Sequence, residues 1–221
     1  MTRAEMLDQL ASRLTALQIQ HPVRVAIDGV DAAGKTTLAD ELAALLLQRN
    51  RPAIRASIDG FHRPRAERHL RGANSPAGYY DDSFDYDALR SVLLEPLGPQ
   101  GSRRFRRMAF DYRTDAPSMT EEELAPADAI LLFDGVFLLR PEINELWDYR
   151  IFVDAPFAVT VERAIVRDTD LFGSVEAARA RYQERYIPGQ QIYLTSVDPL
   201  RHAQAIVHNE DPEHPSLVFS A

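Results

Sequence analysis

One stretch of the chain, VRVAIDGVDAAGKTTL at residues 23–38, narrows the choice of fold more than any other. An apolar run from Val23 to Ile27 predicts a strand, and it leads into the pattern G-x-x-x-x-G-K-T at 29–36. Glycines in such a loop let successive backbone N–H groups turn around a phosphate, and the helix that follows adds the positive end of its dipole. The stretch therefore predicts a P-loop between a strand and an amphipathic helix.

The side chains of this loop indicate what it binds. Lys35 is expected to reach the β- and γ-phosphates of ATP, and the Thr36 hydroxyl is expected to hold Mg²⁺. The pattern alone does not separate ATP from GTP as the donor. The predicted ATP-binding residues are Gly29, Asp31, Ala32, Ala33, Gly34, Lys35, Thr36 and Thr37.

Length and charge favour one domain and argue against two classes of partner. A chain of 221 residues is long enough for a single α/β domain with insertions, spanning 1–221. A formal net charge of −8 argues against nonspecific binding to nucleic acid or to an anionic membrane. The sequence has no cysteine, which excludes disulfides and a thiol nucleophile. It also has no apolar stretch of signal-peptide or membrane-spanning length, so we expect a soluble, cytoplasmic protein that could form homo-oligomers.

The rest of the chain reads as alternating helices and strands. An N-terminal amphipathic helix is predicted at about 2–20, and the P-loop helix leads to a second strand at 53–58, which completes a β–α–β unit. The remaining segments come in the following order: an irregular stretch at 60–82, a short helix within 85–97, a pair of short strands at 103–112, a buried central strand in AILLFDG at 129–135, a strand at 149–153, helices at 157–167 and 174–186, a closing strand at 204–208 and a Pro-interrupted tail at 209–221.

Two aspartates are expected to join the P-loop. Asp59 and Asp134 each follow a predicted strand, and parallel strands end at the same edge of a sheet, where ligands of open α/β sheets bind. Asp59 is the candidate base for an acceptor hydroxyl, and Asp134 the candidate for orienting Mg²⁺ together with Thr36. Either aspartate could instead simply end its strand and cap the next element.

The ordered motifs GVDAAGKTT, SIDGFHR, YYDDSFDYDAL, MAFDYRTD, ILLFDGVF, RAIVRD and YIPGQQIY resemble the uridine kinase and phosphoribulokinase family of P-loop kinases, from residue 23 to about 209. The uridine kinase-like branch is the most similar. This resemblance implies an ATP-dependent, Mg²⁺-requiring kinase that phosphorylates a primary hydroxyl. It implies a P-loop kinase fold with a five-stranded parallel sheet flanked by helices, an acceptor-site insert at about 60–84 and 103–115, and a small arginine-bearing lid at about 163–186.

The resemblance also implies roles for individual residues. Asp59 matches the acid that activates the acceptor hydroxyl and helps hold Mg²⁺, and Asp82 matches the acid that binds ribose hydroxyls. Tyr112 matches an aromatic position beside the acceptor base, and Asp134 stands where the family usually has Glu. Independently of the family, His62 lies close enough to Asp59 in sequence to contact substrate. The matches to the lid arginines, which contact the transferring phosphates, are Arg163 and Arg167.

Two departures from the family pattern leave the acceptor open. The histidine that reads the pyrimidine in uridine kinases is replaced by Asp115, and an aspartate only accepts hydrogen bonds where a neutral histidine can also donate. The lid lacks the usual Glu-Arg-Gly-Arg element, and one of three nearby arginines could supply the missing charge: Arg179, Arg181 or Arg185. A nucleoside is the first candidate acceptor, and a sugar, a pantothenate-like or a nicotinamide riboside-like molecule remains an alternative.

Other classes of function share part of these signals. A P-loop NTPase or regulatory nucleotide-binding protein would position water instead of a hydroxyl. A kinase acting on nucleic acid would use arginines as a phosphate track, although the net charge makes nucleic acid an unlikely partner. The arginines in question form either a positive rim or a solvated face: Arg63, Arg65, Arg68 and Arg71 with Arg103, Arg104, Arg106 and Arg107. The polar, aromatic insert at 60–84 favours an acceptor pocket.

Overall fold

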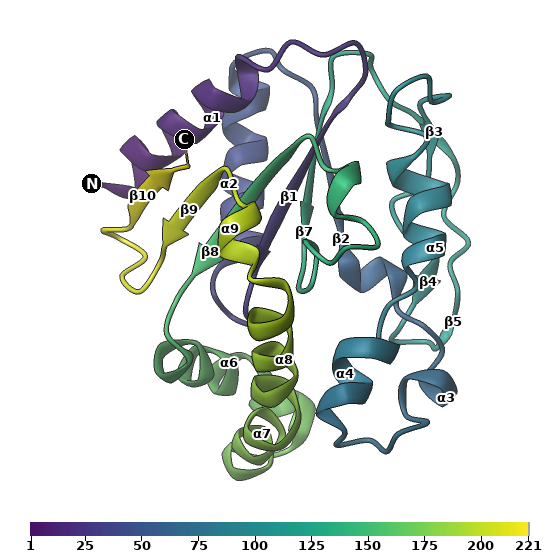
Figure 1. Cartoon of the computed structure of the whole chain (residues 1–221), viewed down its shortest axis with the longest axis vertical. Helices are drawn as coiled ribbons and strands as arrows, with labels where there is room; N and C mark the ends of the chain where they lie inside the picture. Colours follow the sequence, from purple (N-terminus) through teal and green to yellow (C-terminus); the bar gives the residue numbers. More distant parts are fainter. Residues whose placement is uncertain (221) are drawn as a thin grey trace.

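The computed structural model describes residues 1–220, and its centre is a six-stranded sheet in the order β10-β9-β8-β1-β7-β2 (Figure 1). Five strands run parallel, which confirms the predicted parallel sheet. They are β1 (Val23–Gly29), β2 (Ala53–Ser57), β7 (Ile130–Asp134), β8 (Tyr149–Asp154) and β9 (Ala205–His208).

The sixth strand, β10 (Ser216–Phe219), lies in the segment predicted to be an irregular tail. It pairs antiparallel with β9 at the edge of the sheet. A four-residue edge strand gains its order from the neighbour it pairs with, so its own residues show little periodicity.

The central strands are buried on both faces, and this brings the predicted acidic residues to one edge. Every residue of β1 and β7 is buried, as expected for parallel strands with helices on both sides. The register places Asp134 beside Ile27 of β1 and beside Ser57 of β2. The carboxyl ends of β1, β2 and β7 therefore meet where the P-loop begins.

Two apolar clusters cover the two faces of this sheet. On one face α1 (Arg3–Thr15) and α2 (Lys35–Gln48) bury leucines such as Leu10 and Leu42 against β1. On the other face Phe133 and Trp147 pack with the segment between β2 and β7. Helix α1 begins after a capping box at Thr2 and ends at Thr15, so it is shorter than the predicted 2–20.

The segment between β2 and β7 forms the insert. Its elements are η1 (Ile58–Phe61), α3 (Arg65–Arg68), α4 (Pro76–Asp82), α5 (Tyr86–Leu89), the π-helical turn η2 (Arg90–Leu94), β3 (Arg104–Phe105), β4 (Phe110–Asp111), β5 (Ala116–Pro117) and β6 (Glu123–Leu124). The two short strands predicted within 103–112 are present as β3 and β4, and each pairs with a later strand, β3 with β6 and β4 with β5. The N–H groups of Arg106 and Ala109 bond to carbonyls of Val92 and Gly60, so the chain does not turn back between β3 and β4.

The helices after β8 include the predicted lid, at about 163–186. They are α6 (Phe157–Phe172), α7 (Val175–Arg181), the π-helical turn η4 (Tyr182–Tyr186), α8 (Ile187–Val197) and α9 (Pro199–His202). A short turn, η3 (Asn144–Leu146), precedes β8. A small third cluster, which includes Ile165, Ala178 and Tyr182, packs α6 against α7. The lid thus has its own apolar contacts apart from the sheet. Within residues 1–220, the helices are too short or too polar for any of them to cross a membrane.

Candidate active site

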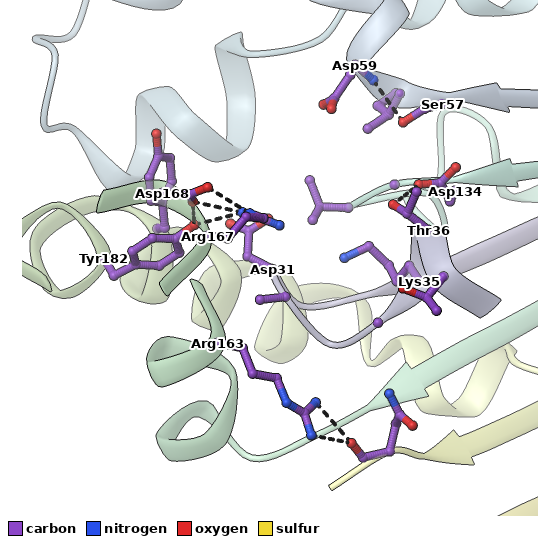
Figure 2. A pocket seen from close by; sticks show the side chains of 18 of the residues that line it. Asp31, Lys35, Thr36, Ser57, Asp59, Asp134, Arg163, Arg167, Asp168 and Tyr182 are labelled. Carbon is purple, nitrogen blue, oxygen red and sulfur yellow. Dashed lines mark hydrogen bonds and ion pairs between the residues drawn. The ribbon is translucent and has the colours of Figure 1, made fainter. Parts of the chain in front are cut away.

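A cavity of about 910 Å³ opens at the carboxyl edge of the sheet, between the P-loop, the insert and the lid (Figure 2). Figure 2 shows Asp59 from the end of β2 above Lys35 from the P-loop on one side of this space, with Arg167 of α6 across from them. The predicted site residues that line it are Asp31, Ala32, Gly34, Lys35, Thr36, Thr37, Asp59, His62, Tyr112, Asp134, Arg163 and Arg167.

The shape of the P-loop depends on two glycines. Gly29 and Gly34 have φ angles of +151° and +101°, which side chains rarely allow. A Cβ atom would lie 2.3 Å from the Val153 carbonyl oxygen at Gly29 and 2.5 Å from the Asn209 side chain at Gly34. Asn209 also donates to the Ala33 carbonyl at 2.7 Å, so the loop is held from the C-terminal segment.

Lys35 lies inside the curve of this loop. Its ammonium donates to the Val30 carbonyl at 2.7 Å, and the residue is 8% exposed. Burial lowers the pKa of Lys35, while the nearby carboxylates of Asp31, Asp28 and Asp134 raise it. The arrangement places a cation at the point where the loop turns around a phosphate.

The candidate metal site combines a hydroxyl and a carboxylate. Thr36 donates to one oxygen of Asp134 at 2.6 Å, and Arg55 donates to the other at 2.8 Å. Asp134 is nearly fully buried, so both of its oxygens are fixed in direction. Among residues 1–220, His, Cys, Asp and Glu form no cluster of three that could hold an ion alone. This donor set suits Mg²⁺, which binds one or two carboxylates and takes its other ligands from phosphates and water.

Asp59 is positioned by the turn η1 at the end of β2. Its backbone N–H donates to the Ser57 hydroxyl at 3.4 Å. Asp59 is exposed to the open cavity. Its pKa is raised by the protein that displaces part of the water around it and by the negative charge of Asp134, while Lys35 opposes both effects. A carboxylate with a raised pKa is a better proton acceptor near neutral pH.

Aromatic rings form the wall beside Asp59. The His62 ring lies 4.7 Å from the Phe84 ring and 5.0 Å from the Tyr112 ring, between centroids. Its Nδ1 lies 3.1 Å from the Asp59 carbonyl oxygen. Burial lowers the pKa of His62 to about 4, so the ring is neutral at pH 7. The wall therefore offers flat, uncharged surface to a ligand.

The structure does not bring Asp82 and Asp115 to this wall. Asp82 forms an ion pair with Arg71 at 3.1 Å. Asp115 accepts from the Arg65 backbone N–H at 2.8 Å and lies 3.5 Å from the Arg68 guanidinium. The lining residues of the cavity include neither aspartate.

The lid arginines differ in what they contact. Arg163 donates to the backbone carbonyls of Asn209 and Glu210, at 3.1 and 2.8 Å, and so holds the C-terminal segment (Figure 2). Arg167 pairs with Asp168 at 2.7 Å and donates to the Tyr182 hydroxyl at 3.1 Å. Arg167 keeps 58% of its side chain exposed at the cavity, so it is the more available of the two for a phosphate.

Two residues that the sequence did not single out hold the P-loop from outside. Gln190 of α8 accepts from the Asp31 backbone N–H at 2.8 Å and donates to the Asp31 carboxylate at 3.0 Å. Tyr79 of α4 donates to the same carboxylate at 3.0 Å. The motif YIPGQQIY contains Gln190 but gives no sign that it meets residue 31, because only the fold brings the two together.

Removing the Gln190 side chain should therefore weaken ATP binding. We expect Gln190→Ala to raise the KM for ATP about 30-fold, because two hydrogen bonds that fix Asp31 are lost and each contributes about 1 kcal/mol. Gln191→Ala is the matched control, because Gln191 is exposed on the same helix. Steady-state kinetics with both variants would measure the effect, and equal KM values for the two variants would contradict it.

Comparison with known proteins places this site in a family. The sequence model of the "Phosphoribulokinase / Uridine kinase family" matches residues 25–195, which is most of the chain. The chain belongs to this family. It is an ATP-dependent small-molecule kinase.

Individual relatives of this kinase are distant but cover nearly its full length. A uridine kinase of Leuconostoc citreum is 25% identical over 194 residues, covering 87% of this chain and 90% of the relative. A uridine kinase of Brevibacillus brevis is 27% identical over 192 residues, covering 85% of each.

Solved structures agree on the fold of the kinase. A possible uridine kinase from Bacillus stearothermophilus has a TM-score of 0.72 at 22% identity, covering 92% of this chain and 97% of that one. A Silicibacter sp. TM1040 protein provisionally described as a fructose transport system kinase also has a TM-score of 0.72, at 26% identity, covering 88% and 95%. The two names differ, since the second refers to a fructose transport system.

Proposed function

We propose that this kinase transfers the γ-phosphate of ATP to a primary hydroxyl of a nucleoside. The observation that carries the proposal is Asp59, which faces the same cavity as Lys35 and Arg167 and lies beside an uncharged aromatic wall. A kinase needs the donor phosphates and an acceptor hydroxyl in one space, with a base at the hydroxyl.

The residues would divide the work between donor and acceptor. The P-loop amides and Lys35 would bind the β- and γ-phosphates, while Asp59 would accept the proton of the attacking hydroxyl. Arg167 would contact the phosphoryl group as its charge moves toward the leaving group. Mg²⁺, held by Thr36 and Asp134 with help from Asp59, would neutralise charge on the phosphate oxygens.

The aromatic wall of the cavity supports a nucleoside as the class of acceptor. The rings of His62, Phe84 and Tyr112 present flat apolar surface, on which a nucleobase can stack. Asp115 lies outside the cavity, so other groups would have to form the hydrogen bonds that recognise a nucleobase. Arg113, whose guanidinium lies 5.8 Å from the Tyr112 ring centroid, is the nearest candidate.

A second candidate is a kinase for a sugar or another small hydroxyl compound. The 26% identity to the Silicibacter protein favours keeping this alternative. An NTPase without an acceptor is disfavoured by the walled space beside Asp59.

A panel of acceptors tests the proposal. We expect ADP release with ATP and Mg²⁺ to rise at least about tenfold when the right acceptor is added, because a bound hydroxyl replaces water as the nucleophile. The panel should contain uridine, cytidine, purine nucleosides, nicotinamide riboside, pantothenate and free sugars. Turnover with a sugar but no nucleoside would contradict the nucleoside assignment, and no acceptor-dependent turnover would contradict the kinase mechanism.

A further inference from the structure

Behind the aromatic rings of the site, the lid and the insert bring several basic side chains together. Arg185 of η4 donates to the backbone carbonyls of Ala73 and Ser75, at 2.6 and 3.4 Å. Arg181, at the end of α7, donates to the side chain of Asn74. Both arginines therefore reach across from the lid to the loop between α3 and α4.

Arg68 and His69 complete this group from the side of the insert. Arg68 keeps only 14% of its side chain exposed. Burial is the largest cause that lowers the pKa of Arg185 and of His69. The positive charges of Arg181 and Arg68 lower the pKa of Arg185 further. The same two charges, together with that of Arg185, lower the pKa of His69. Arg181 and Arg185 meet because they bond to consecutive residues of one loop, 73–75, and the charge of Arg68 acts on the same place.

The charges in this group are poorly compensated. Arg185 is only 4% exposed, and among residues 1–220 neither it nor Arg181 forms an ion pair with a carboxylate. The nearby acids are Asp115, which lies 3.5 Å from Arg68, and Glu184, which accepts from Asn74 at 2.9 Å. The Nε atoms of Arg68, Arg181 and Arg185 are all buried, and none has a hydrogen-bond partner within the described part of the chain.

A buried guanidinium N–H without an acceptor is costly, because it has lost water and gained no hydrogen bond in return. Arg68, Arg181 and Arg185 each have a partner at the end of the guanidinium, but each leaves its Nε–H without one. Three such N–H groups at one place are explained most simply by an anion that binds there. Guanidinium groups match phosphate in shape and donate to it in pairs. Phosphate also carries more negative charge than a carboxylate, so it balances more of the positive charge of the three arginines.

We propose that Arg68, Arg181 and Arg185 form a binding site for a phosphate group between the insert and the lid. The site is distinct from the P-loop, and its binding does not depend on which acceptor the kinase uses. A nucleoside acceptor carries no phosphate, so with that acceptor the group belongs to a separate phosphorylated compound; a phosphorylated acceptor is the other source that the test distinguishes.

The position of the site couples it to the catalytic cavity. The Arg185 guanidinium lies 5.6 Å from the ring centroid of Tyr79, and that of Arg181 lies 5.7 Å from the ring of Tyr186. Both tyrosines line the large cavity, and Tyr79 also donates to Asp31 of the P-loop. A phosphate bound here would tie the lid to the insert and fix the tyrosines between them.

Binding of inorganic phosphate tests the proposal directly. The P-loop also binds phosphate, so it should first be filled with Mg²⁺ and a nonhydrolysable ATP analogue. Phosphate is then titrated at constant ionic strength by calorimetry. We expect saturable binding to the wild type, and a dissociation constant raised at least about tenfold in Arg181→Gln and Arg185→Gln.

Arg179→Gln is the matched control, because Arg179 lies on α7 but pairs with Glu162 at 2.8 Å. It should bind phosphate as the wild type does. If Arg185→Gln fails to fold, as judged by circular dichroism, then Arg181→Gln and Arg68→Gln decide the result. Absence of saturable binding to the wild type, or unchanged binding in these variants, would overturn the proposal.

Kinetics separate the two sources of the phosphate group. If it belongs to the acceptor, inorganic phosphate should raise the KM for a phosphorylated acceptor and leave kcat unchanged. If it belongs to a separate compound, phosphate should change kcat while the KM for the acceptor stays the same. Both outcomes keep the site, and its failure to bind would leave the assignment of the kinase reaction intact.

Discussion

Replacing Lys35 by alanine should reduce kcat for phosphoryl transfer by about 10³-fold, because the variant loses the ammonium that meets the β- and γ-phosphates. The lysine lies inside the loop and is held there by the Val30 carbonyl. The ammonium is therefore already in place, and the protein does not have to rearrange to bring it to the phosphates when the phosphoryl group moves. The effect would be measured as ADP release with saturating acceptor.

The control for this variant is a cation at the other end of the same helix. Arg49 follows α2 and pairs on the surface with Asp8, so Arg49→Ala should keep wild-type turnover. Circular dichroism of Lys35→Ala should show an intact fold. A Lys35→Ala protein that retains wild-type turnover would remove the P-loop lysine from the mechanism.

Asp59→Asn should bind ATP normally and transfer phosphate about 10²- to 10⁴-fold more slowly, the range for loss of a general base. An amide has the same shape as the carboxylate but cannot accept the proton of the hydroxyl. Single-turnover kinetics would isolate this step from product release. Asp87→Asn, on the exposed side of α5, is the control and should react as the wild type does.

The pH dependence of kcat gives a second measure of Asp59. The base works only when it is unprotonated, so wild-type kcat should fall as the pH drops through its pKa. Two opposing effects set the pH of this fall: displaced water and Asp134 raise the pKa of Asp59, and Mg²⁺ held beside it would lower that pKa. Asp59→Asn should lose this acidic limb, and an unchanged profile would show that another group is the base.

The sequence was most informative where local pattern and topology agree. A continuous apolar run predicts a buried parallel strand, and parallel strands end at one edge, so Asp59 and Asp134 could be placed near the P-loop before any coordinates. The five parallel strands followed from the same rule together with the family resemblance.

Contacts set by tertiary structure were beyond the sequence. Gln190 and Asp31 meet across 159 positions, and neither local pattern refers to the other. Alignment with the family placed Asp115 at the acceptor, but a positive φ of 54° at this residue and its bonds to α3 turn it elsewhere. The edge strand β10 was missed because its order comes from pairing with β9.

The buried ammonium of the P-loop has a practical consequence, since Lys35 is the only lysine in the sequence and every other cationic side chain is arginine or histidine. Apart from the α-amino group, reagents that acylate amines have one target, and it lies where the donor phosphates bind. Labelling of the protein should therefore report occupancy of the nucleotide site, with ATP protecting the amine.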